Sequence, residues 1–194
     1  MTQPAPHPSA AKHTLLQLAF DVDADTRQSL MLEGKAPALS DLVGWEFAGL
    51  NAAKAAHWFG FGKFKKGFYQ GPPRVGSGPE PYIQGYNVVV HQDGVDKPHR
   101  ARPSEDHPKR HGFFRVHPVV PGSRDSRYPK ALLLDYGLGA NGVSPEAMLR
   151  DYLVQVYEDD PTLLLGYADL ALGPVRIPAG FFVLKRQNRH QFTG

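Results

Sequence analysis

The chain has 194 residues, no cysteine, 20 glycines, 18 prolines and a formal net charge of +3 at pH 7. This length fits one domain with a core of its own, and the lack of cysteine excludes a disulfide scaffold, a thiolate metal site and a cysteine nucleophile. So many glycines and prolines argue against a helix bundle and favour short strands joined by turns.

The N-terminal segment has no recognisable targeting signal. Residues 2–10 are rich in proline and uncharged, so they lack the basic start and apolar run of a signal peptide. No apolar stretch of 18 residues occurs in the sequence, which excludes a membrane-spanning helix. We therefore expect a soluble, cytoplasmic protein with a disordered tail at residues 1–12 and a single domain at residues 13–190.

Short helices are expected before the first strand and after it. Residues 13–32 have helical spacing of apolar side chains, with Asp25 placed to cap a second helix and Gly34 placed to end it. Asn51 is placed to begin a short alanine-rich helix that runs to Trp58.

From residue 42 onward the apolar pattern takes the period of two that is typical of strands. Eight segments have this character: residues 42–50, 61–69, 82–91, 112–120, 130–136, 149–158, 163–172 and 177–186. Residues 92–110 contain three prolines and no apolar periodicity, which predicts a mobile loop. The pattern predicts a mainly β protein, an eight-stranded antiparallel up-and-down barrel with short N-terminal helices. A two-sheet sandwich has the same strand count and is the alternative.

This layout resembles the calycin group, which comprises lipocalins and fatty-acid-binding-type barrels. The likeness covers residues 40–189 and is carried by a short helix before the first strand, by Gly44 and Trp45 in that strand, and by Arg186 and Arg189 at the end of the last strand. The resemblance implies that the tryptophan lies across a closed barrel end with an arginine packed on its ring. The lipocalin signature has one residue between the glycine and the tryptophan, and this chain has none, so the likeness supports the fold better than the function.

An eight-stranded barrel can hold one small ligand in its interior. Aromatic side chains on the strands are the candidates to line it, and they are Trp45, Phe47, Phe64, Phe68, Tyr86, Phe114, Tyr152 and Phe182. They predict binding of an apolar or amphipathic small molecule, such as a fatty acid, isoprenoid, sterol or aromatic pigment. No cofactor is expected.

Three aspartates interrupt apolar strands and suggest an alternative function. A carboxylate forced into a barrel interior has a raised pKa and can act as a general acid or base. Asp135, Asp151, Asp169 and Tyr152 are therefore the candidate catalytic residues of a cofactor-free isomerase, cyclase or lyase. Convergence of two or more polar groups would favour the enzyme, with Asn87, Tyr136 and Tyr167 as further candidates. The competing interpretation is that the aspartates point outward or pair with basic residues on neighbouring strands.

Charged and aromatic residues are unevenly distributed. Five Lys or Arg and no acid lie between Lys54 and Arg74, interleaved with aromatic residues. Strand alternation explains this pattern, and a portal for an anionic ligand or a transient contact with an anionic membrane surface is the second interpretation. Nucleic acid is not expected as a partner. Five histidines fall between His91 and His117, but their spacing suits no metal site, and a solvated basic loop accounts for His99 and His107.

Overall fold

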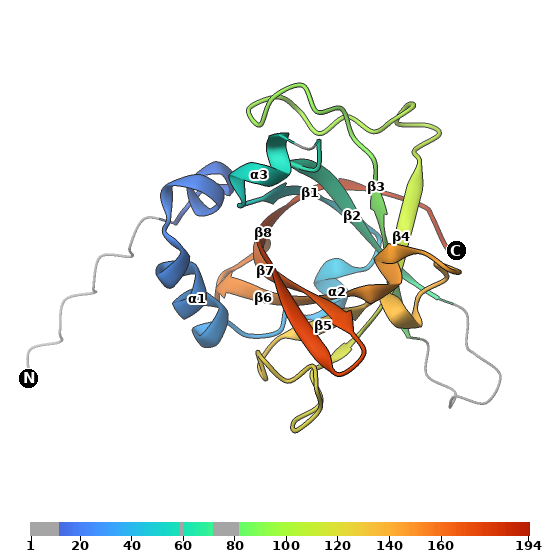
Figure 1. The fold of residues 1–194 in the computed structure, drawn as a ribbon. Coiled ribbons are helices and arrows are strands. Elements are labelled where there is room, and N and C mark those ends of the chain that lie inside the picture. Colours follow the sequence, from blue (N-terminus) through green and yellow to red (C-terminus); the bar gives the residue numbers. More distant parts are fainter. Residues whose placement is uncertain (1–11, 59, 72–81) are drawn as a thin grey trace, which may run out of the picture.

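The computed structural model describes residues 12–58, 60–71 and 82–194, without the side chains of Lys54 and Ala55. Eight antiparallel strands form one closed barrel in sequential order (Figure 1). They are β1 Trp45–Asn51, β2 Lys63–Gln70, β3 Ile83–Val88, β4 Arg110–Pro118, β5 Leu132–Asp135, β6 Leu149–Tyr157, β7 Asp160–Leu172 and β8 Val175–Arg189. The predicted barrel is confirmed, and the sandwich is excluded because β1 pairs with β8 along its whole length. Residues 1–11 of the expected tail lie outside the described residues.

Among the described residues, six short helical segments accompany the barrel. They are η1 Gln17–Asp21, α1 Ala24–Glu33, α2 Leu39–Leu42, α3 Lys54–Trp58, η2 Tyr136–Leu138 and η3 Pro145–Met148. The cap of α1 is Asp23 rather than the predicted Asp25, because the Asp23 side chain accepts a hydrogen bond from the Thr26 N–H at 2.7 Å. Within the described part of the chain, every helix is too short or too polar to cross a bilayer.

Side chains alternate between the interior of the barrel and its outer face. The interior holds one apolar cluster, which includes Phe47, Phe68, Phe114 and Leu164. On the outer face, η1 and α1 cover β6, β7 and β8, and Met31 of α1 is buried there. The helices thus complete a second apolar layer outside the barrel wall.

The two ends of the barrel differ in what covers them. The short helix α2 precedes β1 and closes one end, with Leu42 fully buried in the interior cluster, and it lies behind the centre of the barrel in Figure 1. We call this the closed end. Because the strands run up and down in order, the β1–β2, β3–β4, β5–β6 and β7–β8 connections all lie at the opposite end, which we call the open end.

Trp45 and two arginines form a stacked contact at the closed end. Trp45 lies opposite Arg189 in the β1–β8 pairing. The guanidinium of Arg189 is 4.0 Å from the indole ring centre and that of Arg186 is 4.9 Å away. This confirms the contact that the calycin resemblance implies, although Trp45 is half-buried rather than fully buried.

Lys63 fastens the polar loop at 92–109 to the barrel. Its buried ammonium donates to Asp93 Oδ1 at 2.8 Å and to the carbonyl oxygens of Gly94, Lys97 and Pro98 at 2.8–3.2 Å. His99 is also buried, with Nε2 2.9 Å from the Gly49 carbonyl oxygen, so the interpretation of a solvated His99 is wrong. The cause is this docking of the loop onto β1 and β2. His107 is exposed as expected, and the mobility of the loop stays a prediction.

Replacing Lys63 by methionine should release this loop. The variant keeps the length of the side chain but loses the charged donor whose three hydrogens are shared among four acceptors, and we expect a loss of about 1.5–3 kcal/mol in the free energy of unfolding. Hydrogen exchange at residues 92–101 should accelerate before global unfolding. The control is Lys97→Met, because Lys97 is mostly exposed and its loss should cost less than about 0.5 kcal/mol. Unchanged exchange in the Lys63 variant would contradict the anchoring role.

Candidate functional site

Four polar side chains meet inside the barrel toward its open end. They are Lys66 on β2, Asn87 on β3, Tyr136 at the start of η2 and Asp151 on β6, and we call them the polar cluster. The strand register places them on the interior face: Lys66 lies beside Phe47 on one side and Asn87 on the other, while Asp151 lies beside Leu134. Strand alternation therefore forces these polar groups among apolar neighbours.

The members of the polar cluster bond to one another. The Lys66 ammonium donates to Asp151 Oδ2 at 2.9 Å, to Asn87 Oδ1 at 2.9 Å and to the Tyr136 hydroxyl oxygen. The Tyr136 hydroxyl donates to Asp151 Oδ2 at 3.0 Å and accepts from Asn87 Nδ2 at 3.1 Å. The side chains of Lys66 and Asp151 are 3% and 6% exposed, so this is a buried ion pair whose ammonium has used all three of its hydrogens.

Burial shifts the pKa values of two members of the polar cluster, Lys66 and Tyr136. Removal from water lowers the pKa of the Lys66 ammonium, and the neighbouring Asp151 carboxylate opposes that shift. Removal from water also raises the pKa of the Tyr136 phenol well above its ordinary value, and the charge of Asp151 raises it further. The phenol is therefore a hydrogen-bond donor to Asp151 at every physiological pH.

Aromatic rings surround the ammonium of Lys66. Its nitrogen lies 5.1–5.3 Å from the ring centres of Phe64, Phe114, Tyr136 and Phe182. Ring faces are electron-rich and attract a cation, most strongly where water is excluded. The site thus combines one buried ion pair with an apolar aromatic wall.

His111 and Glu146 lie between the polar cluster and solvent. His111 pairs with Asn87 across β3 and β4, and its Nδ1 is 3.4 Å from Glu146 Oε1. Glu146 also accepts from the Ser144 hydroxyl, which fixes it at the start of η3. Both side chains are more than a third exposed, whereas the cluster behind them is buried. This pair therefore marks the approach from water to the polar cluster.

The pKa of His111 should report on the cluster. Burial lowers it from the ordinary 6.5, Glu146 opposes the shift, and the charge of Lys66 lowers it further. We therefore expect an NMR titration to give a value below 6.5 that rises in Lys66→Met and falls in Glu146→Gln. His111→Gln identifies the resonance. A His111 pKa that responds to neither substitution would place the imidazole outside the field of the cluster.

Most of the predicted lining residues do point into the barrel. Trp45 and the five predicted phenylalanines belong to the interior cluster or pack against it. In the closed half these rings fill the space themselves, since Phe68 packs edge-to-face on both Phe47 and Phe114 with ring centres 5.6 Å apart. Phe64 and Phe182, 6.0 Å apart, lie nearer the open end. The aromatic wall around Lys66 is therefore the part of the interior cluster that lies toward the open end.

Tyr86 and Tyr152 do not line the interior, which corrects the prediction for both. Tyr86 points to the outer face, where its hydroxyl donates to Glu46 at 3.0 Å. Tyr152 points outward against Tyr128 and Tyr167. Each of them is the chain neighbour of an interior residue, Asn87 or Asp151, so strand alternation places it on the outer face. Apolar cover outside the wall buries a ring there as well as the interior does.

The three predicted aspartates have three different environments. Asp151 joins the polar cluster together with Asn87 and Tyr136, so the suspected convergence of polar groups occurs. Asp135 caps η2 and pairs with Arg150 at 3.2 Å, as the competing interpretation held. Asp169 is buried on the outer face, with a pKa raised by burial and opposed by its ion pair with Arg127 at 3.0 Å. Only Asp151 can take part in chemistry in the interior.

The sequence interpretation missed Lys66, although a signal was present. Lys66 alternates with Phe64 and Phe68 on one face of β2, so an interior phenylalanine on either side requires an interior lysine. Lysines were expected to face outward because an unpaired buried ammonium is costly. The partner that makes burial tolerable, Asp151, is 85 positions away in the sequence, and the sequence pattern did not show this pairing.

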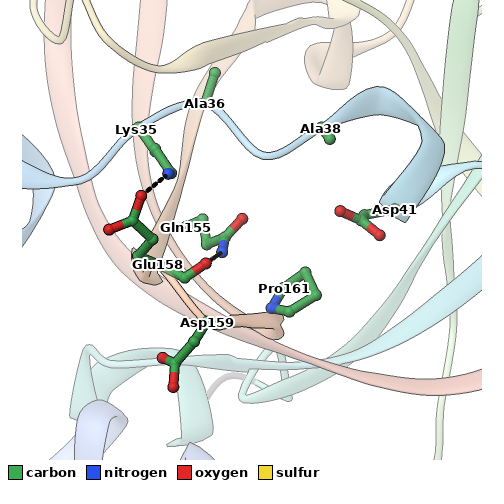
Figure 2. A pocket seen from close by; sticks show the side chains of 8 residues that line it. All are labelled: Lys35, Ala36, Ala38, Asp41, Gln155, Glu158, Asp159 and Pro161. Atoms are coloured by element: carbon green, nitrogen blue, oxygen red, sulfur yellow. Dashed lines mark hydrogen bonds and ion pairs between the residues drawn. The ribbon is translucent and has the colours of Figure 1, made fainter.

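Two surface hollows lie away from the polar cluster. One, of about 490 Å³, is near the closed end, where Lys35 pairs with Glu158 at 2.8 Å and Gln155 and Asp41 form other parts of the lining (Figure 2). The other, of about 480 Å³, lies outside the wall beside Glu46. Neither is lined by a member of the cluster. In the described ranges, no three His, Asp or Glu side chains are grouped to hold a metal ion.

No family model, no curated protein and no solved structure matches this chain. The closed barrel is consistent with a calycin-like fold, and a fold of this kind does not by itself specify a function.

Proposed function

We propose that this chain binds a small, mostly apolar molecule at the open end of the barrel, with the polar group of that molecule against the polar cluster. The buried Lys66–Asp151 pair among aromatic rings carries this proposal. Apolar residues of similar volume stabilise a core at least as well as a buried ion pair does, so stability alone gives no reason for the pair. Buried titratable groups with shifted proton affinities concentrate at functional sites.

The unused hydrogen-bonding capacity of the cluster suggests the chemistry of the ligand. Lys66 and Tyr136 have used all their hydrogens within the cluster. Three positions of the cluster keep capacity. Asn87 has one further N–H, since its other N–H goes to Tyr136, and Asn87 Oδ1 keeps a lone pair, since among the described residues it accepts from Lys66 alone. Asp151 Oδ1 also has capacity, since both cluster bonds of this carboxylate go to Oδ2. The ligand group must therefore accept one hydrogen bond and donate another.

A hydroxyl group meets both requirements. A carboxylate can only accept and would face the charge of Asp151, while an ammonium can only donate and would face Lys66. The ion pair is neutral as a whole, so it offers no net attraction to a charged head group. The site therefore favours apolar alcohols over other apolar ligands. The hydrocarbon part of the alcohol would lie against Phe64 and Phe182.

A matched ligand series tests this proposal. The ligands are compared by how well they displace the fluorescent probe N-phenyl-1-naphthylamine from the wild-type chain. We expect the dissociation constant of decan-1-ol to be at least about tenfold lower than that of decanoate or decylamine, in keeping with one or two well-made hydrogen bonds. Native mass spectrometry should show one bound alcohol per chain. If no member of the series binds at micromolar concentration, the binding function is refuted. If decanoate binds most tightly, the hydroxyl preference is refuted.

Variants locate the ligand. Asp151→Asn should reduce the preference for decan-1-ol, because the carboxylate acceptor is lost, while Asp135→Asn, a matched change on the outer face, should leave the preference unchanged. Asn87→Ser keeps both charges of the ion pair but removes the amide N–H, together with the amide oxygen that accepts from Lys66, and should weaken alcohol binding on its own. Unchanged binding in both cluster variants would place the ligand elsewhere.

A cofactor-free enzyme is the second candidate function. It is favoured by the contact of Asp151, Tyr136 and Asn87, because a carboxylate and a phenol in a dry site can shuttle protons. The test incubates a bound carbonyl compound, such as 2-decanone, with the chain in D₂O and follows deuterium at the carbons next to the carbonyl by mass spectrometry. Exchange that depends on Asp151 and not on Asp135 would support catalysis. Exchange equal to that in buffer would contradict it.

A further inference from the structure

Exposed apolar side chains are concentrated at the open end. In the β1–β2 connection, Trp58 is 90% exposed and Phe61 is 69% exposed. In the connection that contains η2 and η3, Leu138 and Val143 are exposed to solvent. Large apolar side chains gathered at the surface are typical of an interaction site.

The tip of the β7–β8 hairpin adds Leu172, Val175 and Ile177, all exposed. We call these three residues and the four in the two preceding connections the apolar rim. The described residues include eleven exposed large apolar side chains, and seven of them belong to this rim. In Figure 1, α3, the hairpin and the segment that follows β5 surround the front of the barrel, which is the open end.

The one polar connection at this end is turned away from the rim. Residues 89–109 between β3 and β4 fold back along the outer wall, where His99 contacts Gly49 of β1 and Glu105 pairs with Lys65 of β2 at 2.8 Å. The charged side chains of this loop are thereby kept beside the barrel. What remains around the opening is mostly apolar.

The rim segments carry few charges. Residues 52–62, 136–148 and 170–178 contain Lys54, Arg176 and a single acid, Glu146. Arg176 is paired with Asp125 and its side chain is only 14% exposed, so its charge is compensated. Glu146 is bonded to Ser144 and faces His111, so it is directed toward the entrance of the barrel. The whole chain carries a net charge of +3. A negatively charged surface is therefore the complementary partner.

We infer that the apolar rim docks on an anionic membrane surface, with Trp58 and Phe61 inserted at the depth of the lipid head groups. Aromatic side chains favour that depth, and the net charge of +3 adds long-range attraction to anionic lipids. The rim consists of separate tips on three connections, which a fluid lipid surface can accommodate. A stable protein partner would need a continuous face of about 800 Å². Docking in this orientation points the open end of the barrel at the membrane.

Trp58 itself can report the docking. The chain has only two tryptophans, and the other, Trp45, lies at the closed end. We expect the chain to co-sediment with vesicles of phosphatidylcholine and phosphatidylglycerol at 3:1, and its tryptophan emission to shift to the blue and be quenched by brominated lipid. Phe61→Ser with Val175→Ser keeps Trp58 and should lower the partition coefficient at least about tenfold, as expected from the apolar area lost.

A second double variant controls for general effects of exposed apolar residues. Leu32→Ser with Val120→Ser removes two side chains of similar exposure that lie outside the rim, and vesicle binding should not change. Equal loss in both double variants, absence of binding, or equal binding to pure phosphatidylcholine would overturn the inference. So would a concentration-dependent dimer in sedimentation that only the rim variant abolishes, because the rim would then contact a second copy. No bound ligand is needed, so the result is independent of the proposed binding function.

Discussion

Replacing Asp151 by leucine should destabilise the fold by about 3–5 kcal/mol, the cost of leaving one member of a buried ion pair without its partner. Lys66 then remains among four aromatic rings and donates hydrogen bonds only to neutral groups. Urea unfolding at pH 7 measures the loss. Lys35→Met breaks an exposed ion pair with Glu158 and should cost less than about 1 kcal/mol in the same assay.

The double variant Lys66→Met with Asp151→Leu should recover most of this loss. It removes both charges, fills a similar volume and leaves Asn87 and Tyr136 hydrogen-bonded to each other at 3.1 Å. We expect its stability to lie within about 1 kcal/mol of the wild type or above it. The same double variant should lose the preference for decan-1-ol. A stable double variant without that preference would separate the function of the ion pair from its contribution to folding.

The cost of Asp151→Leu should also depend on pH in a defined direction. In the unfolded chain Lys66 has its ordinary pKa of 10.5, whereas burial lowers the pKa in the folded state, and loss of the opposing carboxylate lowers it further. Between the lowered pKa of the folded state and 10.5 the unfolded chain therefore binds more protons, so the stability of the variant rises as the pH approaches 10.5. The difference in the free energy of unfolding between the variant and the wild type should be larger at pH 7 than at pH 9.5. The same difference at both pH values would show that Lys66 is hydrated in the variant.

The architecture could be predicted because it depends on local patterns that repeat. Eight segments with a period of two, punctuated by glycine and proline, specify eight strands, and their short connections specify an up-and-down order. The contact of Trp45 with the last strand followed from closure of the barrel. The site could not be predicted to the same extent, because the polar cluster joins residues 66, 87, 136 and 151, which no local pattern connects.

Which face of each strand points into the barrel is harder to predict than the strand itself. Tyr152 and Tyr86 are aromatic and lie in apolar strands, but the N-terminal helices and the C-terminal Phe192 provide apolar cover outside the wall. With both faces of a strand buried, alternation no longer separates interior from exterior. A lysine among phenylalanines, as at Lys66, is the stronger sign of an interior site, because its burial has to be compensated by a partner.

Replacing Trp45 by alanine should be the most damaging change at the closed end. The guanidinium groups of Arg186 and Arg189 both contact the indole. Arg186 also donates to the Asp41 carbonyl oxygen at 2.6 Å, which fastens α2 over the barrel. We expect a loss of about 3 kcal/mol for the ring and about 0.5–2 kcal/mol for the cation contacts. For a chain of this size the melting temperature should fall by roughly 10 °C.

Trp58→Ala is the matched control, because Trp58 is 90% exposed at the opposite end. Its removal should change the free energy of unfolding by less than about 0.5 kcal/mol, while reducing vesicle binding. A double-mutant cycle between Trp45→Ala and Arg189→Met should give a coupling energy of about 0.5–2 kcal/mol. Equal thermal shifts for the two tryptophan variants, or zero coupling to Arg189, would mean that the barrel is closed by α2 and the β1–β8 pairing alone, without a contribution from the stacked arginines.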